Sequence, residues 1–239
     1  MKHSSIIPIL IMGLCNLLYV WSDCDFRAGS CCPSSVGSVI IANTVTIVPA
    51  NAFSGCTTLT NITFAEPSIV SLLGDNAFKL SSLTLIAIPN SVTIIGNEVF
   101  YACNGLISVI IPDSVTLLGI QVFSSCNGLT SVTIGSGLAT LPDFTFAYCS
   151  GLLSITIPNT VKSLGIYVFL ACGRLKSVHI GNGLTTLPDY TFAYCVGLIN
   201  ITVPKAVTSL GTDVFLAAQL LLQLLSQTIL ETLYMPMVA

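Results

Sequence analysis

The sequence has very few charged residues. Only 7% of its 239 residues are Asp, Glu, Lys or Arg, and the formal net charge is −3 at pH 7. An ordinary domain has about 25% charged residues. The few Lys and Arg residues are scattered along the chain, whereas a nucleic-acid-binding surface needs them clustered. We therefore expect no nucleic-acid partner.

Long hydrophobic runs are missing from residues 41–215, although 53% of the whole chain is hydrophobic. Gly, Pro, Asn, Ser or Thr interrupts this region every few positions. A membrane-spanning helix needs about 20 consecutive apolar residues. The composition instead suits a stack of short coils that feed their apolar side chains into one shared core.

Histidine is scarce, because only His3 and His179 occur. A hydrolase triad needs a base that is oriented by an acid. The sequence contains no Ser or Cys nucleophile motif that would belong to such a triad. Asp143 and Asp189 lie two repeats apart, too far for an acid pair, and each is expected to cap the turn that follows it. Phosphate, dinucleotide and EF-hand loops are absent as well. We expect no enzyme activity, no cofactor and no metal site.

What the chain contains is a repeat. Residues 180–202 read IGNGLTTLPDYTFAYCVGLINIT and closely match residues 134–156, IGSGLATLPDFTFAYCSGLLSIT; the same skeleton occurs in residues 111–133. A fixed period of this length predicts stacked coils, each of which needs its neighbours to bury its apolar face. Eight coils begin at Ile41, Phe64, Ile88, Ile111, Ile134, Ile157, Ile180 and Val203.

Every coil carries the same parts in the same order. An alternating run such as Leu129, Val132 and Ile134 predicts a short strand with every second residue inward. A Phe-x-x-Cys-x-x-Leu run follows later in the coil, and its spacing favours a helical or 3₁₀ turn on the opposite side. Stacking predicts an aromatic column in the core, formed by Phe53, Phe78, Phe100, Phe123, Phe146, Phe169, Phe192 and Phe215.

A second predicted column contains cysteine in most coils. Its members are Cys56, Cys103, Cys126, Cys149, Cys172 and Cys195, with Ala218 in the last coil. Parallel side chains one coil apart keep their Cβ atoms about 5 Å apart, farther than the ~3.8 Å that a disulfide prefers. A single file also cannot surround a zinc ion. We expect these cysteines to pack as small apolar residues.

The two ends of the chain differ from the repeats. Residues 1–22 have a polar start and an apolar core, with Val20 and Ser22 in cleavage-site positions, which predicts a signal peptide and a secreted protein. An uncleaved membrane anchor is the alternative. Residues 216–239 have apolar positions at helical spacing, which predicts a capping helix over the last coil, or else a frayed tail.

Residues 23–40 form a predicted cap over the first coil, because a solenoid must cover its open end. The segment contains Cys24, Cys31 and Cys32. In an oxidising compartment a bridge from Cys24 to Cys31 or Cys32 would hold such a cap. The remaining thiol would stay free or pair elsewhere.

The repeat has the form Leu-x-x-Ile-x-Ile-Pro-x-x-Val-x-x-Leu-Gly-x-x-x-Phe-x-x-Cys and extends from about Ile41 to Phe215. It resembles the BspA-like (treponemal) class of leucine-rich repeats, although Ser114, Gly137 and Thr160 stand where plain leucine-rich repeats have an Asn ladder. The resemblance implies a repeat solenoid: a curved right-handed coil with a parallel β-sheet on the concave face and short helical or 3₁₀ turns opposite. It also implies a secreted or cell-surface protein of adhesive or recognition type, with no catalytic residues to carry over.

The outward residues of the predicted strands are the candidate binding surface for a protein or glycan partner. They form a ladder of small hydroxyl and amide groups beside the only basic coil, which contains Lys162, Arg174, Lys176 and His179. A simply solvated sheet face is the alternative. The candidate residues are Asn61, Thr63, Ser131, Thr133, Ser154, Thr156, Lys176, Ser177, His179, Asn200 and Thr202.

Two Asn-Ile-Thr sequons, which start at Asn61 and Asn200, predict N-glycosylation sites on the same face. Glycans at both positions would obstruct binding there. Two other functions stay open: a structural or matrix protein that self-associates through its ends, and an ice-binding Ser-x-Thr ladder. Ice binding is disfavoured, because the ladder is irregular at Ala87, Ile110 and His179.

Overall fold

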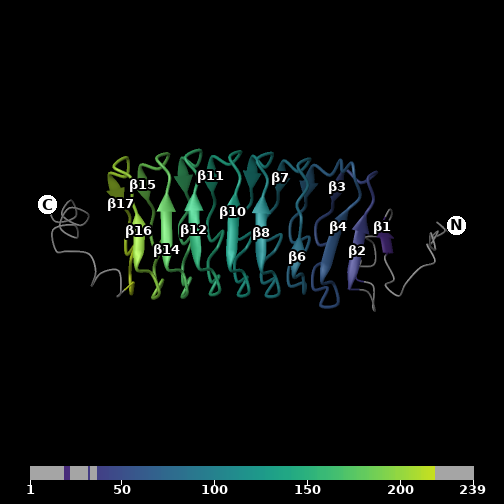
Figure 1. Cartoon of the computed structure of the whole chain (residues 1–239), viewed down its shortest axis with the longest axis horizontal. Helices are drawn as coiled ribbons and strands as arrows, with labels where there is room; N and C mark the ends of the chain where they lie inside the picture. The colour runs from purple at the N-terminus through teal and green to yellow at the C-terminus, as the bar shows by residue number, and fades with distance from the viewer. Residues whose placement is uncertain (1–18, 22–31, 33–36, 219–239) are drawn as a thin grey trace.

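The computed structural model describes residues 19–21, 32 and 37–218, and the coils stack into one elongated solenoid (Figure 1). Each coil contributes one strand to a first row, which faces the viewer in Figure 1. The strands of this row are β1 (Tyr19–Trp21), β2 (Ser38–Ile41), β4 (Asn61–Phe64), β6 (Leu85–Ile86), β8 (Ser108–Ile111), β10 (Ser131–Ile134), β12 (Ser154–Ile157), β14 (Ser177–Ile180) and β16 (Asn200–Thr202).

A second row of two-residue strands runs along another side of the coils. The sequence predicts only one sheet. Each strand of the second row has only two residues, which is too short to show an alternating pattern of apolar and polar residues. The strands of this row are β3 (Ile47–Val48), β5 (Leu72–Leu73), β7 (Ile94–Ile95), β9 (Leu117–Leu118), β11 (Thr140–Leu141), β13 (Ser163–Leu164), β15 (Thr186–Leu187) and β17 (Ser209–Leu210).

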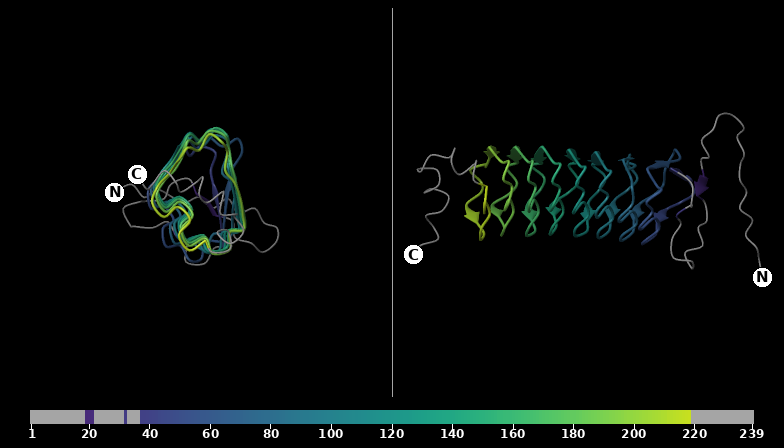
Figure 2. Two further views of the ribbon diagram at one scale, coloured as in Figure 1. Left: turned by 90° about the vertical axis from the view of Figure 1, so that its left-hand side faces the viewer. Right: turned by 90° about the horizontal axis from the view of Figure 1, so that it is seen from below.

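All strand pairs are parallel and keep one register. Ser108 lies opposite Ser131 and Ile111 opposite Ile134, so a residue lies beside its counterpart in the next coil. The first row is hydrogen-bonded in three segments, β1-β2-β4-β6, β8-β10 and β12-β14-β16. Seen along the axis, successive coils nearly overlay (Figure 2), so the curvature is slight over this length. The predicted parallel-strand solenoid is confirmed.

The ends of the chain are described only in part. β1 falls within the predicted signal peptide and pairs with β2, with Val20 opposite Ile40. The rest of residues 1–22 and the predicted capping segment after residue 218 lie outside the described residues. The signal peptide and the capping helix therefore stay predictions.

The turn around each column phenylalanine is not helical, and no helix occurs in residues 37–218. Non-glycine residues two before and two after the phenylalanine, such as Gln121 and Ser125, have φ between 51° and 63°. These left-handed residues interrupt the right-handed succession that a 3₁₀ helix needs. Between them, the N–H of Phe123 donates to the carbonyl of Thr145 in the next coil at 2.9 Å. The predicted helical turn is wrong for this reason.

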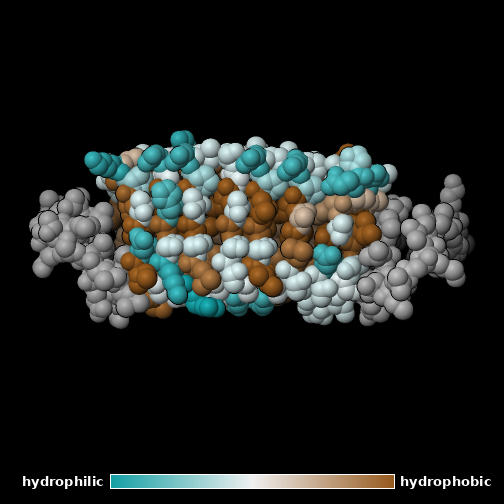
Figure 3. All heavy atoms as spheres, in the orientation of Figure 1, coloured by the Kyte–Doolittle hydropathy of each residue, from teal (hydrophilic) through white to brown (hydrophobic). Residues whose placement is uncertain are grey.

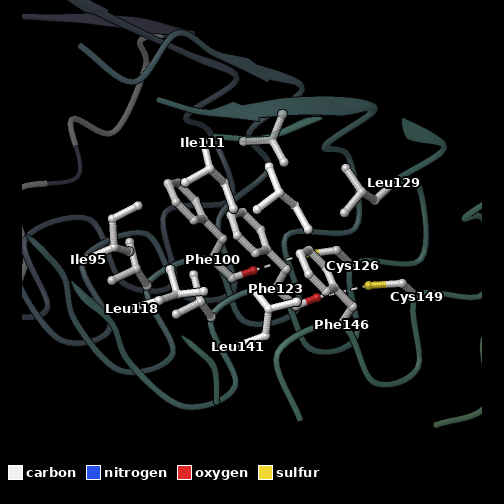
Figure 4. Packing of buried hydrophobic residues seen from close by; sticks show 14 of the residues in the cluster. Ile95, Phe100, Ile111, Leu118, Phe123, Cys126, Leu129, Leu141, Phe146 and Cys149 are labelled. Carbon is white, nitrogen blue, oxygen red and sulfur yellow. Dashed lines mark hydrogen bonds between the residues drawn. The ribbon is translucent and has the colours of Figure 1, made fainter. Parts of the chain in front are cut away.

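The phenylalanine column is confirmed. From Phe53 to Phe215, successive ring centroids are 5.2–5.8 Å apart and the ring planes lie within 9° of parallel. Figure 4 shows three of its members, Phe100, Phe123 and Phe146, enclosed by aliphatic side chains. The centroid spacing is within the range that stabilises aromatic pairs beyond simple burial.

The buried cysteines are hydrogen-bond donors as well as small packing residues. The thiol of Cys126 donates to the carbonyl of Phe100 at 3.0 Å, and Cys149 donates to Phe123 at 3.1 Å (Figure 4). Cys103, Cys172 and Cys195 make the same bond to the preceding coil. Ser81, also buried, takes the cysteine position in its own coil. A side chain at this position therefore satisfies a buried carbonyl, which an apolar residue would not do.

The disulfide in the structure joins Cys32 to Cys56, whose Cα atoms are 5.3 Å apart. This corrects the expectation that Cys56 packs as a free thiol. Of the two partners considered for Cys24, it excludes Cys32 and leaves Cys31, with Cys32 as the thiol that pairs elsewhere. Cys32 does not belong to the single file of coil cysteines, so the spacing along that file does not restrict it. Cys24 and Cys31 lie outside the described residues, and their pairing stays a prediction.

Burial makes the thiol column a source of alkaline instability. It raises the pKa of Cys103 to about 11 and that of Cys149 to about 12, from an ordinary 9.0. The unfolded chain therefore releases these protons first, and folding stability present below pH 9 is lost as the pH rises toward 12. We expect a loss of up to about 1.4 kcal/mol per pH unit for each thiol.

Urea unfolding at pH 8, 9 and 10 in oxygen-free buffer measures this loss. The Cys149→Ala variant is the control, because it lacks one titrating thiol and should lose stability less steeply with pH. Equal pH slopes for the wild type and the variant would contradict the assignment.

Candidate binding surface on the first-row strands

The strand face consists of the outward side chains of the first-row strands. In β12 the buried residues Ile155 and Ile157 alternate with the exposed residues Ser154 and Thr156, as the two-residue period of a strand requires. Across the face in Figure 3, apolar and weakly polar residues alternate in bands, and the most hydrophilic residues lie along the upper edge and toward the lower left.

The strand face contains the predicted site residues. Thr63, Ser131, Thr133, Ser154, Thr156, Lys176, His179, Asn200 and Thr202 are exposed, and Asn61 and Ser177 are half-buried. Register places His179 between Thr156 and Thr202 of the neighbouring strands. All candidate residues except Lys176 thus lie in two files that follow the axis, the first and third positions of each strand, and Lys176 directly precedes β14.

Two large apolar residues interrupt these files. Leu85 of β6 is 56% exposed and Ile110 of β8 is 64% exposed. They separate Asn61 and Thr63, near the N-terminal end, from the continuous polar part that extends over β10, β12, β14 and β16. The strand face is therefore continuously polar only in its C-terminal half.

The hydroxyl groups of the strand face differ in their bonding from several hydroxyls that lie just beside it. Just outside the strands, Thr60 donates to the carbonyl of Gly37 at 2.6 Å and Thr130 to that of Ile107 at 3.0 Å. In the second row the hydroxyls of Thr140 and Ser163 also bond at 2.8 Å, whereas those of Thr186 and Ser209, which lie opposite each other, form no side-chain hydrogen bond to a described residue. Within the part of the chain that the structure describes, no side-chain hydrogen bond forms at Ser131, Thr133, Ser154, Thr156 or Thr202. These groups remain available to a partner.

The basic coil does not form one basic patch. His179 belongs to the strand face and Lys176 directly precedes β14. Lys162 lies beside β13 in the second row, where its Nζ donates to the carbonyl of Asn159 at 3.2 Å. Arg174 is exposed in the turn before β14. Residues close in sequence are distributed around the coil, so the strand face contains only part of this charge.

Asp143 and Asp189 bridge coils instead of capping their own turns, which corrects the sequence-based expectation. Their Oδ1 atoms accept the N–H groups of Ile166 at 2.9 Å and Thr212 at 2.7 Å in the following coil. A Cβ atom at Gly165 would lie 2.2 Å from Asp143 Oδ1. A Pro-Asp coil therefore requires glycine in the next coil, which explains why the closest sequence matches are two coils apart.

The sequence analysis missed an aromatic cluster on the turn side of the coils. Phe144, Tyr167 and Tyr190 stack with centroid distances of 4.7 and 4.9 Å. The nearby carboxylate of Asp213 is the main cause that raises the pKa of Tyr190. The available signal was an aromatic residue two positions before the column phenylalanine in three successive coils.

Two kinds of structure are not found among the residues described here. No helix there is long and apolar enough to cross a membrane. No group of three or more His, Cys, Asp or Glu side chains there converges as metal ligands would.

The strand rows and the aromatic column define a leucine-rich-repeat-type solenoid with an open strand face. The chain belongs to the BspA-type leucine-rich-repeat family: residues 27–152 and 93–221 match the BspA type Leucine rich repeat region, in 6 copies. No curated protein matches the chain.

The solved structures that are similar to this one include two leucine-rich repeat proteins. A leucine-rich repeat protein from Eubacterium ventriosum has 23% identity and a TM-score of 0.64, over 76% of this chain and 59% of that chain. The T. pallidum Leucine Rich Repeat protein has 26% identity and a TM-score of 0.59, over 83% of this chain and 84% of that chain. The chain thus spans about three-fifths of the length of the Eubacterium protein, and that likeness extends to the fold.

Proposed function

We propose that this chain is a recognition or adhesion module that binds a protein or glycan partner through its strand face. The supporting observation is the set of unpartnered hydroxyl and amide groups on β10, β12, β14 and β16. In contrast, the hydroxyls of Thr60, Thr84 and Thr130, just outside the strands, hold neighbouring coils together. The role is non-enzymatic, and family membership supports a repeat protein that works by binding.

The strand face suits recognition because it is flat and already ordered. Ser, Thr and Asn side chains are short, so binding restricts few rotamers and a partner can approach the sheet closely. Many weak hydrogen bonds then add along the axis. His179 supplies a larger side chain between Thr156 and Thr202, and Lys176 supplies a positive charge beside it.

We propose an extracellular or cell-surface location. The predicted signal segment at residues 1–22 supports export, and the Cys32–Cys56 disulfide suits an oxidising compartment. The sequons at Asn61 and Asn200 lie on the strand face. A glycan at Asn200 would cover Ser177, which lies opposite it in β14, so binding requires that this site be unoccupied.

A matched pair of triple variants tests the proposal. One variant places lysine on the strand face through Ser154→Lys, Thr156→Lys and Ser177→Lys. The control makes the same charge change at three exposed second-row positions, through Ser163→Lys, Thr186→Lys and Ser209→Lys. Partners are sought with wild-type protein on arrays of extracellular proteins and glycans. We expect the strand-face variant to bind at least about tenfold more weakly and the control to bind normally.

Equal binding by both variants would place the site elsewhere. Light scattering over a range of protein concentrations separates recognition from self-association. The apparent mass of a recognition module stays constant, whereas the apparent mass of a matrix protein that associates end to end rises with protein concentration.

A further inference from the structure

The outward residues of the second-row strands change from apolar to polar halfway along the solenoid. In each of these two-residue strands the first residue is the more exposed one. From β3 to β17 these residues are Ile47, Leu72, Ile94, Leu117, Thr140, Ser163, Thr186 and Ser209. The first four are aliphatic, and the last four carry hydroxyl groups.

The aliphatic half forms one continuous surface, the second-row strip, which consists of Ile47, Leu72, Ile94 and Leu117. Its strands β3, β5, β7 and β9 are hydrogen-bonded as one sheet, and the register places each strip residue beside the next. Ile47 is 46% exposed, Ile94 is 36% exposed and Leu117 is 58% exposed, while Leu72 is half-buried. Single exposed aliphatic residues are ordinary, but a contiguous row of them marks an interaction surface.

The hydroxyl groups beside the strip already have partners within the fold. The hydroxyl of Ser71 donates to the carbonyl of Thr46 at 3.2 Å. Those of Thr93 and Thr116 donate in the same way to the preceding coil, at 3.3 and 3.4 Å. Covering a hydroxyl that keeps its hydrogen bond costs much less free energy than covering one that loses its water without replacement. This flank can therefore be covered together with the strip.

Charge also distinguishes the two halves of the second row. The strip residues and the residues that directly precede them are all uncharged. In the other half, Lys162 is exposed beside Ser163, and the hydroxyls of Thr186 and Ser209 bond to no described side chain. Covering that half would remove water from a charge and from hydroxyls that need it. A flat partner is therefore favoured only on the N-terminal half of the row.

The strip is complementary to a second copy of itself. A twofold axis between Leu72 and Ile94 brings Ile47 opposite the partner's Leu117 and Leu72 opposite the partner's Ile94. Every aliphatic side chain then faces another one, because the strip residues follow one another at a single strand spacing. The polar halves of the two copies extend in opposite directions, outside the overlap. Twofold interfaces use the same patch on both chains in this way.

We propose that the second-row strip is the interface of a twofold-symmetric dimer of this chain. The four strands span about 14 Å, three times the distance between neighbouring strands. The contact is therefore smaller than the ~800 Å² per partner that a stable interface buries. The dimer is weak, with a Kd on the order of 0.1 mM, and forms where the protein is concentrated.

This dimer goes beyond the recognition role proposed above and does not depend on it. The strand face belongs to the other row of strands, so both copies keep it open. A particle with two strand faces binds a repeated or surface-attached partner more tightly than one strand face alone, because the second contact forms within the same complex.

Sedimentation equilibrium of the protein from about 10 μM to about 1 mM tests the dimer. The wild-type mass should rise toward two chains and stop there. Leu117→Lys should keep the mass of one chain, because the new charge faces the partner's Ile47. Thr186→Lys is the matched control: it places the same charge in the polar half of the same row and should dimerise as the wild type does. Both positions are exposed, and circular dichroism checks that both variants fold.

A pair of opposite charges tests the twofold arrangement itself. Ile47→Glu alone should weaken the dimer as Leu117→Lys does. The double variant Ile47→Glu/Leu117→Lys places a carboxylate opposite an ammonium at each end of the strip. It should dimerise about threefold or more tightly than either single variant at low salt.

A wild-type mass that stays at one chain up to the highest concentration overturns the inference, and so does a mass that exceeds two chains. Equal weakening by Thr186→Lys, or no recovery in the double variant, also overturns it.

The dimer and the proposed function fail separately. The strand-face triple variant should dimerise as the wild type does, and Leu117→Lys should keep the single-site affinity for the partner of the strand face. Because Leu117→Lys cannot pair through the strip, it is the protein whose mass should stay constant in the light-scattering series that separates recognition from end-to-end association.

Discussion

Replacement of Phe146 by alanine is expected to lower the free energy of unfolding by about 3–5 kcal/mol. Phe146 is fully buried in the middle of the column. Its ring stacks at 5.4 Å on Phe123 and at 5.6 Å on Phe169. The change leaves a cavity and removes both stacking contacts. Urea unfolding followed by circular dichroism measures the loss.

The same variant should also separate the array into two cooperative halves. Coils contact only their neighbours, so stability depends on each coil and on each interface between coils. A broadened or two-step unfolding curve is expected for Phe146→Ala. Phe144→Ala is the control, since Phe144 is only half-buried in the outer stack, and it should unfold in one step with a smaller loss. An unchanged midpoint for Phe146→Ala would contradict the described register.

Replacement of Gly183 by alanine is expected to lower the free energy of unfolding by about 3 kcal/mol or more. A Cβ atom at this position would lie 2.2 Å from the carbonyl oxygen of Val161 and 2.4 Å from that of Asn159. Both contacts are with backbone atoms of the preceding coil, so relief requires that two coils move apart. The urea midpoint and the yield of folded protein measure the effect.

Gly173→Ala is the matched control for this steric argument. A Cβ atom at Gly173 would meet its nearest atom, in Val196, at 4.0 Å. This variant should be neutral, or more stable by about 0.4–1 kcal/mol through its less flexible unfolded chain. Equal losses for Gly173→Ala and Gly183→Ala would show that close coil contact is not the cause.

The stacking of the coils could be predicted from the sequence because each inward residue repeats at one spacing. Phe100, Phe123 and Phe146 need only the repeat to be placed above one another. The alternation of β12 likewise placed Ser154 and Thr156 outside. These features follow from local periodicity, and the structure confirms them.

Features that depend on backbone conformation or on contact between coils could not be predicted. Gln121 and Ser125 have left-handed backbones, yet neither residue type marks such a conformation as glycine would. The Cys32–Cys56 bond requires knowledge of where residue 32 lies relative to the first coil. The thiol donors, such as Cys126, need the position of a carbonyl in the preceding coil.

The candidate site shows the same limit. Thr60, just before β4, and Thr133, in β10, are both exposed threonines, but only Thr60 bonds to a carbonyl of the neighbouring coil. Composition cannot separate a hydroxyl that holds two coils together from one that is available to a partner.

A lysine scan along the strand face tests directly whether this face binds the partner. Thr63→Lys, Thr133→Lys, Thr156→Lys and Thr202→Lys each add one charge at the third position of a strand, and Thr186→Lys adds one to the second row. Affinity for the partner of the wild-type protein is measured for each variant. If the strand face binds the partner, we expect the affinity to fall about tenfold or more in the Thr133, Thr156 or Thr202 variants and to stay unchanged in the Thr186 variant. Wild-type affinity in all four strand-face variants would contradict it.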